Sequence, residues 1–323
     1  MTALAARIRA GDLRAASRLI RDVDDGRQSA IAELQAIFPY TGKATVLGVT
    51  GSPGSGKSSL VDQLIGHYRT LGKQVGVIAV DPTSPFSGGA ILGDRIRMQD
   101  HAGDEGVFIR SLATRGNLGG LSRAASDSVR IMDAMGKDLI IVETVGVGQD
   151  EIDIAGLAHC VAVVLVPGMG DDIQAIKAGI LEVADLFVVN KADRDGADRT
   201  VRDLRAMLEL RHAVHGEASA DQWEPPIVKT VATRGDGVAE LSAAVAQHLA
   251  FLDKSGQRAV REAQRSRTEF LSILRERLLA SALRRLEHEK GQLDEVAGRI
   301  ARREVDPWSI ADLLAKGVAG GAS

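Results

Sequence analysis

The sequence has one cysteine, no excess of basic residues and no apolar run long enough to cross a membrane. Cys160 is the single cysteine among 323 residues, so an internal disulfide is impossible and a reducing compartment is indicated. Its apolar neighbours in "AHCVAVVLV" predict a buried packing role rather than a nucleophile. A membrane-spanning helix needs about 18 consecutive apolar residues, and no segment reaches that length.

The charge balance excludes another class of protein. Lysine and arginine together number 40 and the acidic residues 43, which gives a formal net charge of −3. A general nucleic-acid-binding protein usually carries a strongly basic domain instead. Hydrophobic residues make up 45% of the chain and charged residues 26%, as is ordinary for a globular protein with a packed core.

The first residues, "MTALAARIRAGDLRAASRLIRD", are rich in arginine and amphipathic. Such a segment resembles a mitochondrial transit peptide, which would place the protein in the mitochondrial matrix. Asp12 and Asp22 argue against that interpretation. Four apolar residues share one helical face: Leu13, Ala16, Leu19 and Ile20. We therefore expect a helix packed on the main domain, and a bacterial cytoplasmic protein.

Short apolar, β-branched runs alternate with helix-like segments through the middle of the chain. Seven runs predict strands: 44–50, 74–80, 106–110, 138–144, 161–167, 186–190 and 226–231. Helix-like segments separate several of them: 57–71, 119–135, 171–183 and 197–212. Most runs are nearly continuous in apolar residues, as in strands buried on both faces. The expected fold class is α/β, with a mainly parallel sheet flanked by helices.

The strand pattern stops at about residue 236. Four helical segments follow, at 237–252, 257–289, 291–303 and 307–316. The long one places five apolar residues on one face: Phe270, Ile273, Leu274, Leu278 and Ala282. We expect an N-terminal helical extension at 1–43, an α/β domain at 44–235 and a C-terminal helical region at 236–323.

A glycine-rich motif follows the first strand. Residues 51–58, "GSPGSGKS", match GxxxxGK[ST] between a predicted strand and a predicted helix. Glycines let successive backbone N–H groups point at phosphate oxygens, and the helix adds its positive N-terminal end. Lys57 should reach the β- and γ-phosphates, and the Ser58 hydroxyl should ligate Mg²⁺. The expected phosphate-binding residues are Pro53, Gly54, Ser55, Gly56, Lys57, Ser58 and Ser59.

A second motif indicates the base. The sixth predicted strand runs into "NKAD", which contains Asn190, Lys191 and Asp193. The Asp193 carboxylate can accept hydrogen bonds from guanine N1–H and N2–H₂, whereas adenine would leave a buried carboxylate unpaired there. The segment "VATRGDG" follows the next strand, and we expect the backbone amides near Ala232 and Thr233 to close over the base. The sequence therefore predicts a guanine nucleotide, GTP or GDP.

Three acidic residues are candidates for a magnesium site. Asp81 follows one predicted strand, Glu143 lies at the carboxyl end of another, and Asp94 lies in a loop after Asp81. Ligands of open α/β sheets bind at the carboxyl ends of the strands, and Mg²⁺ takes hard oxygen ligands, usually one or two carboxylates. Gly146 and Gly148 would let the segment after Glu143 move with the γ-phosphate.

Together these motifs resemble the methylmalonyl-CoA mutase-associated GTPases, the MeaB/ArgK type among the metallochaperone-like P-loop GTPases. The resemblance covers about residues 45–235 and rests on "GSPGSGKSS", "VDPTSP", "LGDRIRM", "FIRSLATRGNLGGLSRA", "VETVGVGQ", "GDDIQAIKAGI" and "NKAD". It implies a GTP-hydrolysing chaperone that gates adenosylcobalamin delivery to an acyl-CoA mutase and protects that enzyme. It also implies a homodimer formed through a C-terminal helical arm.

The resemblance assigns roles to individual residues. Lys57 and Ser58 would hold the phosphates and Mg²⁺, and three carboxylates would surround the ion: Asp81, Asp94 and Glu143. Arg97 would stabilise the γ-phosphate, so the expected catalytic residues are Lys57, Asp94, Arg97 and Glu143. Gln174 and Lys177 would belong to a mobile segment that responds to the partner mutase. Without the resemblance, these two would be read as an exposed helix face.

Three alternatives stay open. A nickel-delivering GTPase for hydrogenase or urease needs clustered His or Cys ligands. Here Cys160 looks solitary, and His212 and His215 have no third partner in the sequence. A P-loop protein kinase would need a base near an acceptor hydroxyl, and none is identifiable. A binding module would hold the nucleotide without hydrolysing it.

Overall fold

The computed structural model describes residues 2–81, 101, 103–113, 123–144, 153–168, 182–215, 222–289 and 293–319. The chain forms two compact units, residues 1–256 and residues 257–323. The three-part division expected from the sequence stays a prediction.

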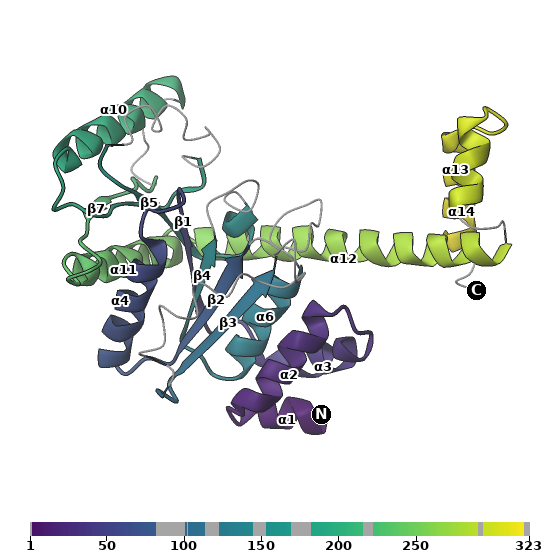
Figure 1. The fold of residues 1–323 in the computed structure, drawn as a ribbon, viewed down its shortest axis with the longest axis horizontal. Coiled ribbons are helices and arrows are strands. Elements are labelled where there is room, and N and C mark those ends of the chain that lie inside the picture. Colours follow the sequence, from purple (N-terminus) through teal and green to yellow (C-terminus); the bar gives the residue numbers. More distant parts are fainter. Residues whose placement is uncertain are drawn as a thin grey trace. The chain divides into compact units, whose positions relative to one another are not determined.

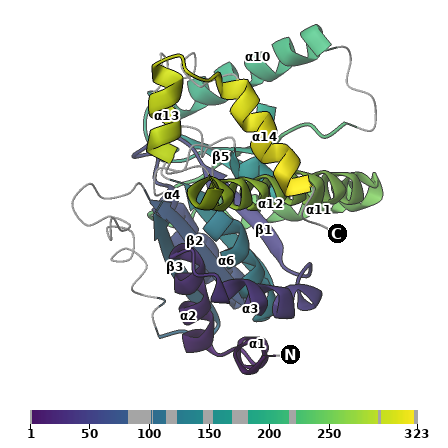
Figure 2. The same cartoon turned by 90° about the vertical axis from the view of Figure 1, so that its right-hand side faces the viewer.

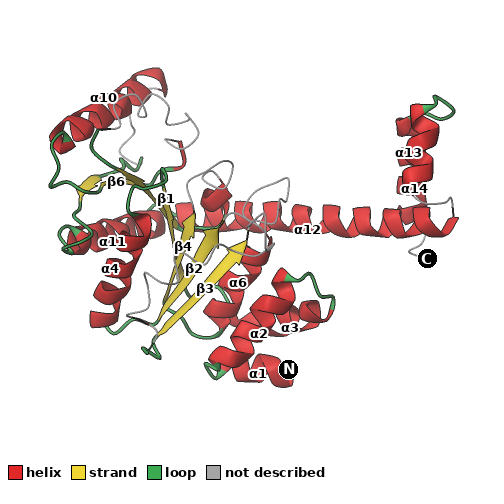
Figure 3. Ribbon diagram, in the orientation of Figure 1, coloured by secondary structure: helices red, strands yellow, loops and turns green. Residues whose placement is uncertain are grey.

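The first unit is built on a seven-stranded sheet in the order β3-β2-β4-β1-β5-β6-β7 (Figures 1 and 3). The strands are β1 (Thr45–Thr50), β2 (Val75–Asp81), β3 (Val107–Ala113), β4 (Leu139–Thr144), β5 (Cys160–Leu165), β6 (Leu186–Val189) and β7 (Ile227–Lys229). Every pair of neighbours runs parallel. The seven predicted strands and the α/β class are confirmed, with strand ends that differ by a few residues.

Helices cover both faces of the sheet, which explains why the strands are apolar throughout. They are α4 (Lys57–Thr70), α6 (Arg123–Ala134), α10 (Ala197–His215) and α11 (Val238–Lys254). One buried cluster contains Leu60 and Leu64 of α4 with Leu241 and Val245 of α11. The other contains residues of α6, α10 and the N-terminal helices. The helix predicted at 171–183 lies almost entirely outside the described residues.

The N-terminal segment forms α1 (Ala3–Arg9), α2 (Leu13–Asp24) and α3 (Ser29–Ile37), and α2 packs against α6. Ala16, Leu19 and Ile20 are fully buried in this contact, so the predicted packing is confirmed. The expectation for Leu13 is wrong: its side chain is 36% exposed. Asp12 caps α2 by accepting hydrogen bonds from the N–H groups of residues 14 and 15.

The second unit consists of α12 (Gln257–Glu289), α13 (Leu293–Ala301) and α14 (Pro307–Ala319). In Figures 1 and 2, α13 and α14 lie at the C-terminal end of α12. The four helices predicted after residue 236 are confirmed as α11 to α14. On the apolar face predicted on α12, Phe270 is 62% exposed and Leu278 is 46% exposed, whereas Ile273 and Ala282 are half-buried. Among the described residues of both units, no helix combines the length and apolarity that a membrane span requires.

Candidate nucleotide-binding site

The glycine-rich loop leaves the sheet at its topological switch point. Strand β1 lies between β4 and β5, and the chain continues from β1 to β2 on one side before it returns to β5 on the other. Ligands of open α/β sheets bind at such a point, outside the carboxyl ends of the strands. The loop after β1 therefore occupies the expected position of a ligand site.

Two glycines of the loop are required by their surroundings. Gly51 has φ +135°, and a Cβ atom there would lie 2.1 Å from the carbonyl oxygen of Val164 in β5. Gly56 has φ +89°, and its Cβ would lie 2.4 Å from Nδ2 of Asn190. Neither position accepts a side chain, because both the backbone angle and the space exclude one. These contacts join the loop to β5 and to the residue after β6.

The Lys57 side chain curls back into the loop. Its Nζ donates hydrogen bonds to the carbonyl oxygens of Gly51 (2.7 Å) and Ser52 (3.0 Å). Lys57 and Ser58 are both buried at the first turn of α4. A buried ammonium and the N-terminal end of a helix lie side by side, and both attract anions.

The Ser58 hydroxyl contacts Glu143 directly. Ser58 Oγ donates a hydrogen bond of 2.7 Å to Glu143 Oε1, and both residues are buried. Beside them, Thr144 Oγ1 donates to Thr50 Oγ1 at 2.8 Å, which links the ends of β4 and β1. The sequence analysis did not predict this threonine pair. The sequence feature that could have indicated it is a threonine at the end of each of the two strands.

The magnesium candidates are only partly described. The structure brings Ser58 and Glu143 together from positions far apart in the chain. Both offer hard oxygen atoms, so the residues present suit Mg²⁺. Asp81 ends β2, whose Ala79 is in register with Glu143, so its backbone lies at the same edge of the sheet. The side chain of Asp81 and the whole of Asp94 lie outside the described residues.

Asn190 is a buried clamp between three segments. Its Nδ2 donates to the carbonyl oxygen of Ser55 at 2.8 Å. Its Oδ1 accepts hydrogen bonds from Thr230 Oγ1 and from the Ala232 N–H, both at 3.1 Å. Asn190 therefore ties the glycine-rich loop to the segment after β7. The Ala232 amide contacts Asn190 here, and its predicted role over the base stays a prediction.

The other base-binding candidates lie near the surface. Lys191 adopts φ +56°, and its Nζ donates to the Gly54 carbonyl at 2.8 Å. Asp193 and Thr233 are exposed. Asp193 lies in a turn beyond the end of β6, and its predicted contact with the guanine base stays a prediction.

The remaining predicted residues divide into two groups. In the glycine-rich loop, Pro53 and Gly54 are exposed, Ser59 is half-buried, and Ser55 is buried. Outside the described residues lie the catalytic candidate Arg97, the partner-responsive Gln174 and Lys177, and the glycines at 146 and 148. Cys160 is fully buried, as predicted.

Known proteins resemble this chain along most of its length. A candidate GTPase of Pyrococcus abyssi is 46% identical over 98% of this chain and 96% of its own. The GTPase ArgK of Escherichia coli is 42% identical over 69% of this chain and 67% of its own. A solved structure of a protein called LAO/AO transport system kinase is 28% identical, with a TM-score of 0.69 over 98% of this chain and 96% of that chain.

A protein family covers the same region. Residues 16–287 match the family described as methylmalonyl Co-A mutase-associated GTPase MeaB. The predicted resemblance and the predicted P-loop GTPase fold are therefore confirmed. Membership of a GTPase family implies that the protein binds guanine nucleotide. The chain belongs to the methylmalonyl Co-A mutase-associated GTPase family, and it is a GTPase.

Proposed function

We propose that this GTPase is a chaperone of an adenosylcobalamin-dependent acyl-CoA mutase, whose cofactor loading it gates and which it protects from loss of function. The family description, which names methylmalonyl-CoA mutase, supports the partner. The observation that carries the proposal is that the end of β5 contacts both the glycine-rich loop and Asn190. In β5, the Val164 carbonyl packs against Gly51, and the Leu165 carbonyl accepts a hydrogen bond of 2.8 Å from the Asn190 N–H.

We infer that these contacts couple the glycine-rich loop to the segment that follows β5 in the sequence. The segment after β5 carries Gln174 and Lys177, which we assign to the partner-responsive switch. We expect a shift of Gly51 to be transmitted to the end of β5, because the two backbones pack so closely that a Cβ atom at Gly51 would lie 2.1 Å from the Val164 carbonyl oxygen. Coupling of this kind is typically about 1–3 kcal/mol and is reciprocal for binding.

Hydrolysis follows from the same residues. The loop N–H groups and Lys57 hold the phosphates, and Ser58 and Glu143, with Asp81 and Asp94, would hold Mg²⁺. When bound, the ion neutralises charge on the β- and γ-phosphates. Arg97 is assigned to stabilising the γ-phosphate. Water attacks the γ-phosphorus, the bond to the β–γ bridging oxygen breaks, and GDP and phosphate leave.

The test of the chaperone proposal is a GTP turnover assay with and without candidate acyl-CoA mutases. We expect the cognate mutase to accelerate hydrolysis, and Lys177→Ala to lose most of that stimulation while it keeps the basal rate and GTP affinity. Lys73→Ala is the matched control, because Lys73 is exposed near the opposite ends of the strands. The proposal is wrong if no mutase stimulates the wild type, or if Lys177→Ala loses basal and stimulated turnover equally.

One similar protein of known structure is named LAO/AO transport system kinase, so the assay must separate phosphate release from phosphate transfer. With γ-³²P-labelled GTP, a GTPase releases labelled inorganic phosphate. A protein kinase labels a partner protein instead, and a pure binding module does neither. A nickel-delivering GTPase would transfer nickel to an apo-hydrogenase or apo-urease, which we do not expect. Glu143→Gln should lower hydrolysis more than GTP binding and raise the Mg²⁺ concentration needed for half-maximal turnover.

We further propose a homodimer through the C-terminal helices, in the bacterial cytoplasm. Phe270, Leu274 and Leu278 repeat every four residues on α12 and are exposed, so they form an apolar stripe that a second copy would cover. Light scattering should show a dimer for the wild type and a monomer for Leu274→Glu. Ser272→Glu is the control, because this exposed residue lies on the opposite side of the helix. A monomeric wild type would contradict the proposal.

A further inference from the structure

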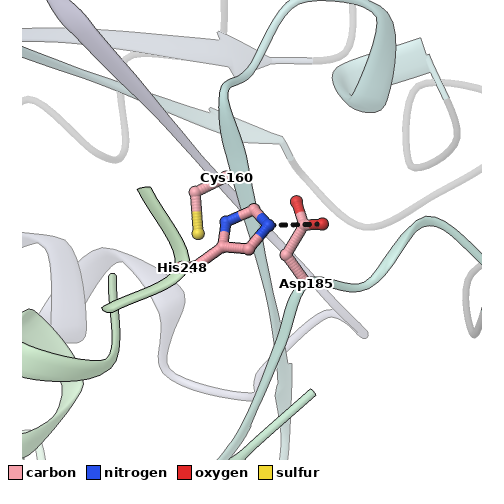
Figure 4. Close-up of side chains that lie close together, drawn as sticks. All are labelled: Cys160, Asp185 and His248. Atoms are coloured by element: carbon pink, nitrogen blue, oxygen red, sulfur yellow. Dashed lines mark ion pairs between the residues drawn. The ribbon is translucent and has the colours of Figure 1, made fainter. Parts of the chain in front are cut away.

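Three side chains of metal-binding type meet at the amino ends of β5 and β6. Cys160 is the first residue of β5, Asp185 directly precedes β6, and His248 lies in α11. One sulfur, oxygen or nitrogen atom from each of the three lies within 4.8 Å of the others. Figure 4 shows the imidazole between the thiol and the carboxylate. In the sequence Cys160 looked solitary, because the two side chains beside it in space, Asp185 and His248, lie far from it along the chain.

His248 is buried without the hydrogen bonds that an imidazole normally makes. The residue is 0% exposed, and neither ring nitrogen has a hydrogen-bond partner within the described parts of the chain. Its Nε2 lies 3.2 Å from Asp185 Oδ1, close enough for an ion pair but outside hydrogen-bonding geometry. A buried polar group left in this state costs about 1–3 kcal/mol, so the site calls for a further partner.

Asp185 and His248 are held in place by their neighbours. Asp185 Oδ2 accepts a hydrogen bond of 2.9 Å from the Val161 N–H, which leaves Oδ1 facing the imidazole. Trp223 Nε1 donates to the Asp185 carbonyl at 2.7 Å, and the Trp223 ring lies 4.9 Å from the His248 ring. Outer contacts of this kind orient metal ligands and are typical of built metal sites.

We propose that Cys160, Asp185 and His248 bind one divalent cation of the zinc class. Thiolate and imidazole ligands favour Zn²⁺ over Mg²⁺ or Ca²⁺. In a tetrahedral site with bonds of about 2.0–2.3 Å, ligand atoms lie about 3.3–3.6 Å apart. The imidazole and carboxylate already have nearly that spacing. The thiol sulfur lies within 4.8 Å of the other two ligand atoms, so it would need to approach them by about 1.5 Å at most.

This site is distinct from the nucleotide site in place and in role. It lies at the amino ends of the strands, whereas the glycine-rich loop lies at their carboxyl ends. Cys160 and His248 are fully buried, so the ion would be resident and not a cargo for delivery. A metal there would tie α11 to β5 and β6, and its binding energy would add to the stability of the fold.

The experiment begins with the full-length wild type. Protein expressed with added zinc and dialysed without chelator should keep about one equivalent of Zn²⁺ by elemental analysis. The apo protein titrated with Co²⁺ should show a sulfur-to-cobalt charge-transfer band in the near ultraviolet. The proposal fails if zinc stays below about 0.1 equivalent and no such band appears. The cluster is then a metal-free Asp185–His248 ion pair.

Variants assign the ligands. Cys160→Ala should abolish the charge-transfer band, and Cys160→Ala and His248→Gln should each weaken Zn²⁺ binding about 100-fold or more. His67→Gln, a change on α4 outside the cluster, should bind as the wild type does. GTP binding by every variant checks that the fold is intact. Cys160→Ser replaces Cys160→Ala if that variant does not fold, and Zn²⁺ binding of wild-type strength in either variant overturns the assignment of the thiol.

Discussion

Buried polar side chains serve different purposes at the two ends of the parallel strands, here called the amino edge and the carboxyl edge of the sheet. At the amino ends, three such side chains form hydrogen bonds with backbone groups at or just before the start of a strand. Asp133 accepts hydrogen bonds from the N–H groups of residues 42–44 just before β1, at 2.5–3.2 Å. Lys137 Nζ donates to the Gly106 carbonyl before β3 at 2.9 Å. Asp185 accepts from the Val161 N–H in β5.

At the carboxyl ends, buried polar side chains hold a loop instead of capping a strand. Asn190 clamps Ser55, and Glu143 accepts from Ser58. Lys57 is folded onto the loop's own carbonyl groups. The hydrogen bonds at the amino ends therefore satisfy backbone groups of the fold, whereas those at the carboxyl ends shape a loop that can receive an anion. Substitutions should therefore separate the edges: nucleotide chemistry should change at one, and the free energy of unfolding at the other.

The largest effect is expected at the carboxyl edge. Lys57→Ala removes the buried charge that would face the β- and γ-phosphates, and phosphoryl transfer depends mainly on positioning and electrostatics. We expect GTP turnover to fall by about 10³-fold or more. Phosphate release under saturating GTP and Mg²⁺ measures it. Lys43→Ala, an exposed lysine at the amino edge, should keep the wild-type rate. Equal rates for Lys57→Ala and the wild type would remove the distinction between the edges.

The largest stability effect is expected at the amino edge. Asp133→Ala leaves three successive backbone N–H groups without their acceptor. The free energy of unfolding in urea should fall by about 1–3 kcal/mol, because the Ala44 N–H is buried and an unsatisfied buried donor is costly. Asp138→Ala is the matched control. Asp138 accepts from one exposed N–H, that of Gln74, so its loss should matter less. A larger loss for Asp138→Ala than for Asp133→Ala would contradict this account.

The next prediction concerns Asp193, an exposed residue at the carboxyl edge, and the choice of the nucleotide base. Asp193→Asn should weaken GTP binding about 10–100-fold, because it loses a charged acceptor for guanine N1–H and N2–H₂. It should improve binding of xanthosine triphosphate, since the amide can donate to the xanthine oxygen. Titration calorimetry measures both, with Asp195→Asn as an exposed control two residues away. Equal affinity of the wild type for ATP and GTP would refute the role of Asp193.

The smallest effect is a pH dependence at the amino edge. Burial, with the Arg69 charge second, lowers the pKa of Lys137 from 10.5 to about 8. Between pH 8 and 10.5 the unfolded chain therefore holds this proton more tightly than the folded chain. Below pH 8, Lys137 is charged in both states, and burying this charge lowers the free energy of unfolding by its full amount. As the pH rises from 8 to 10.5, this loss of stability disappears, because Lys137 loses its proton. The unfolding free energy of the wild type minus that of Lys137→Met should rise by at most about 1.4 kcal/mol per pH unit. A constant difference would place the pKa of Lys137 outside this range.

Local sequence patterns determined most of the secondary structure. Continuous apolar runs mark strands buried on both faces, and the 3.6-residue period marks the helices, because both signals depend on neighbours within a few residues. The glycine-rich motif was equally readable, since its strand and helix flank it directly. The NKAD motif indicated guanine for the same reason, although the exposure of Asp193 was not foreseen.

Only the tertiary structure decided which side chains meet. Sheet order places Glu143 beside Ser58 and Asn190 beside Ser55, and it brings His248 and Asp185 to Cys160. The pattern of a helix likewise gives its apolar face but not what covers it: α2 is buried on α6, whereas the stripe on α12 is exposed. The periodicity of a segment carries no information about contacts between residues that lie far apart in the sequence. Those contacts arise only when parallel strands, connected by helices, are paired in one particular order.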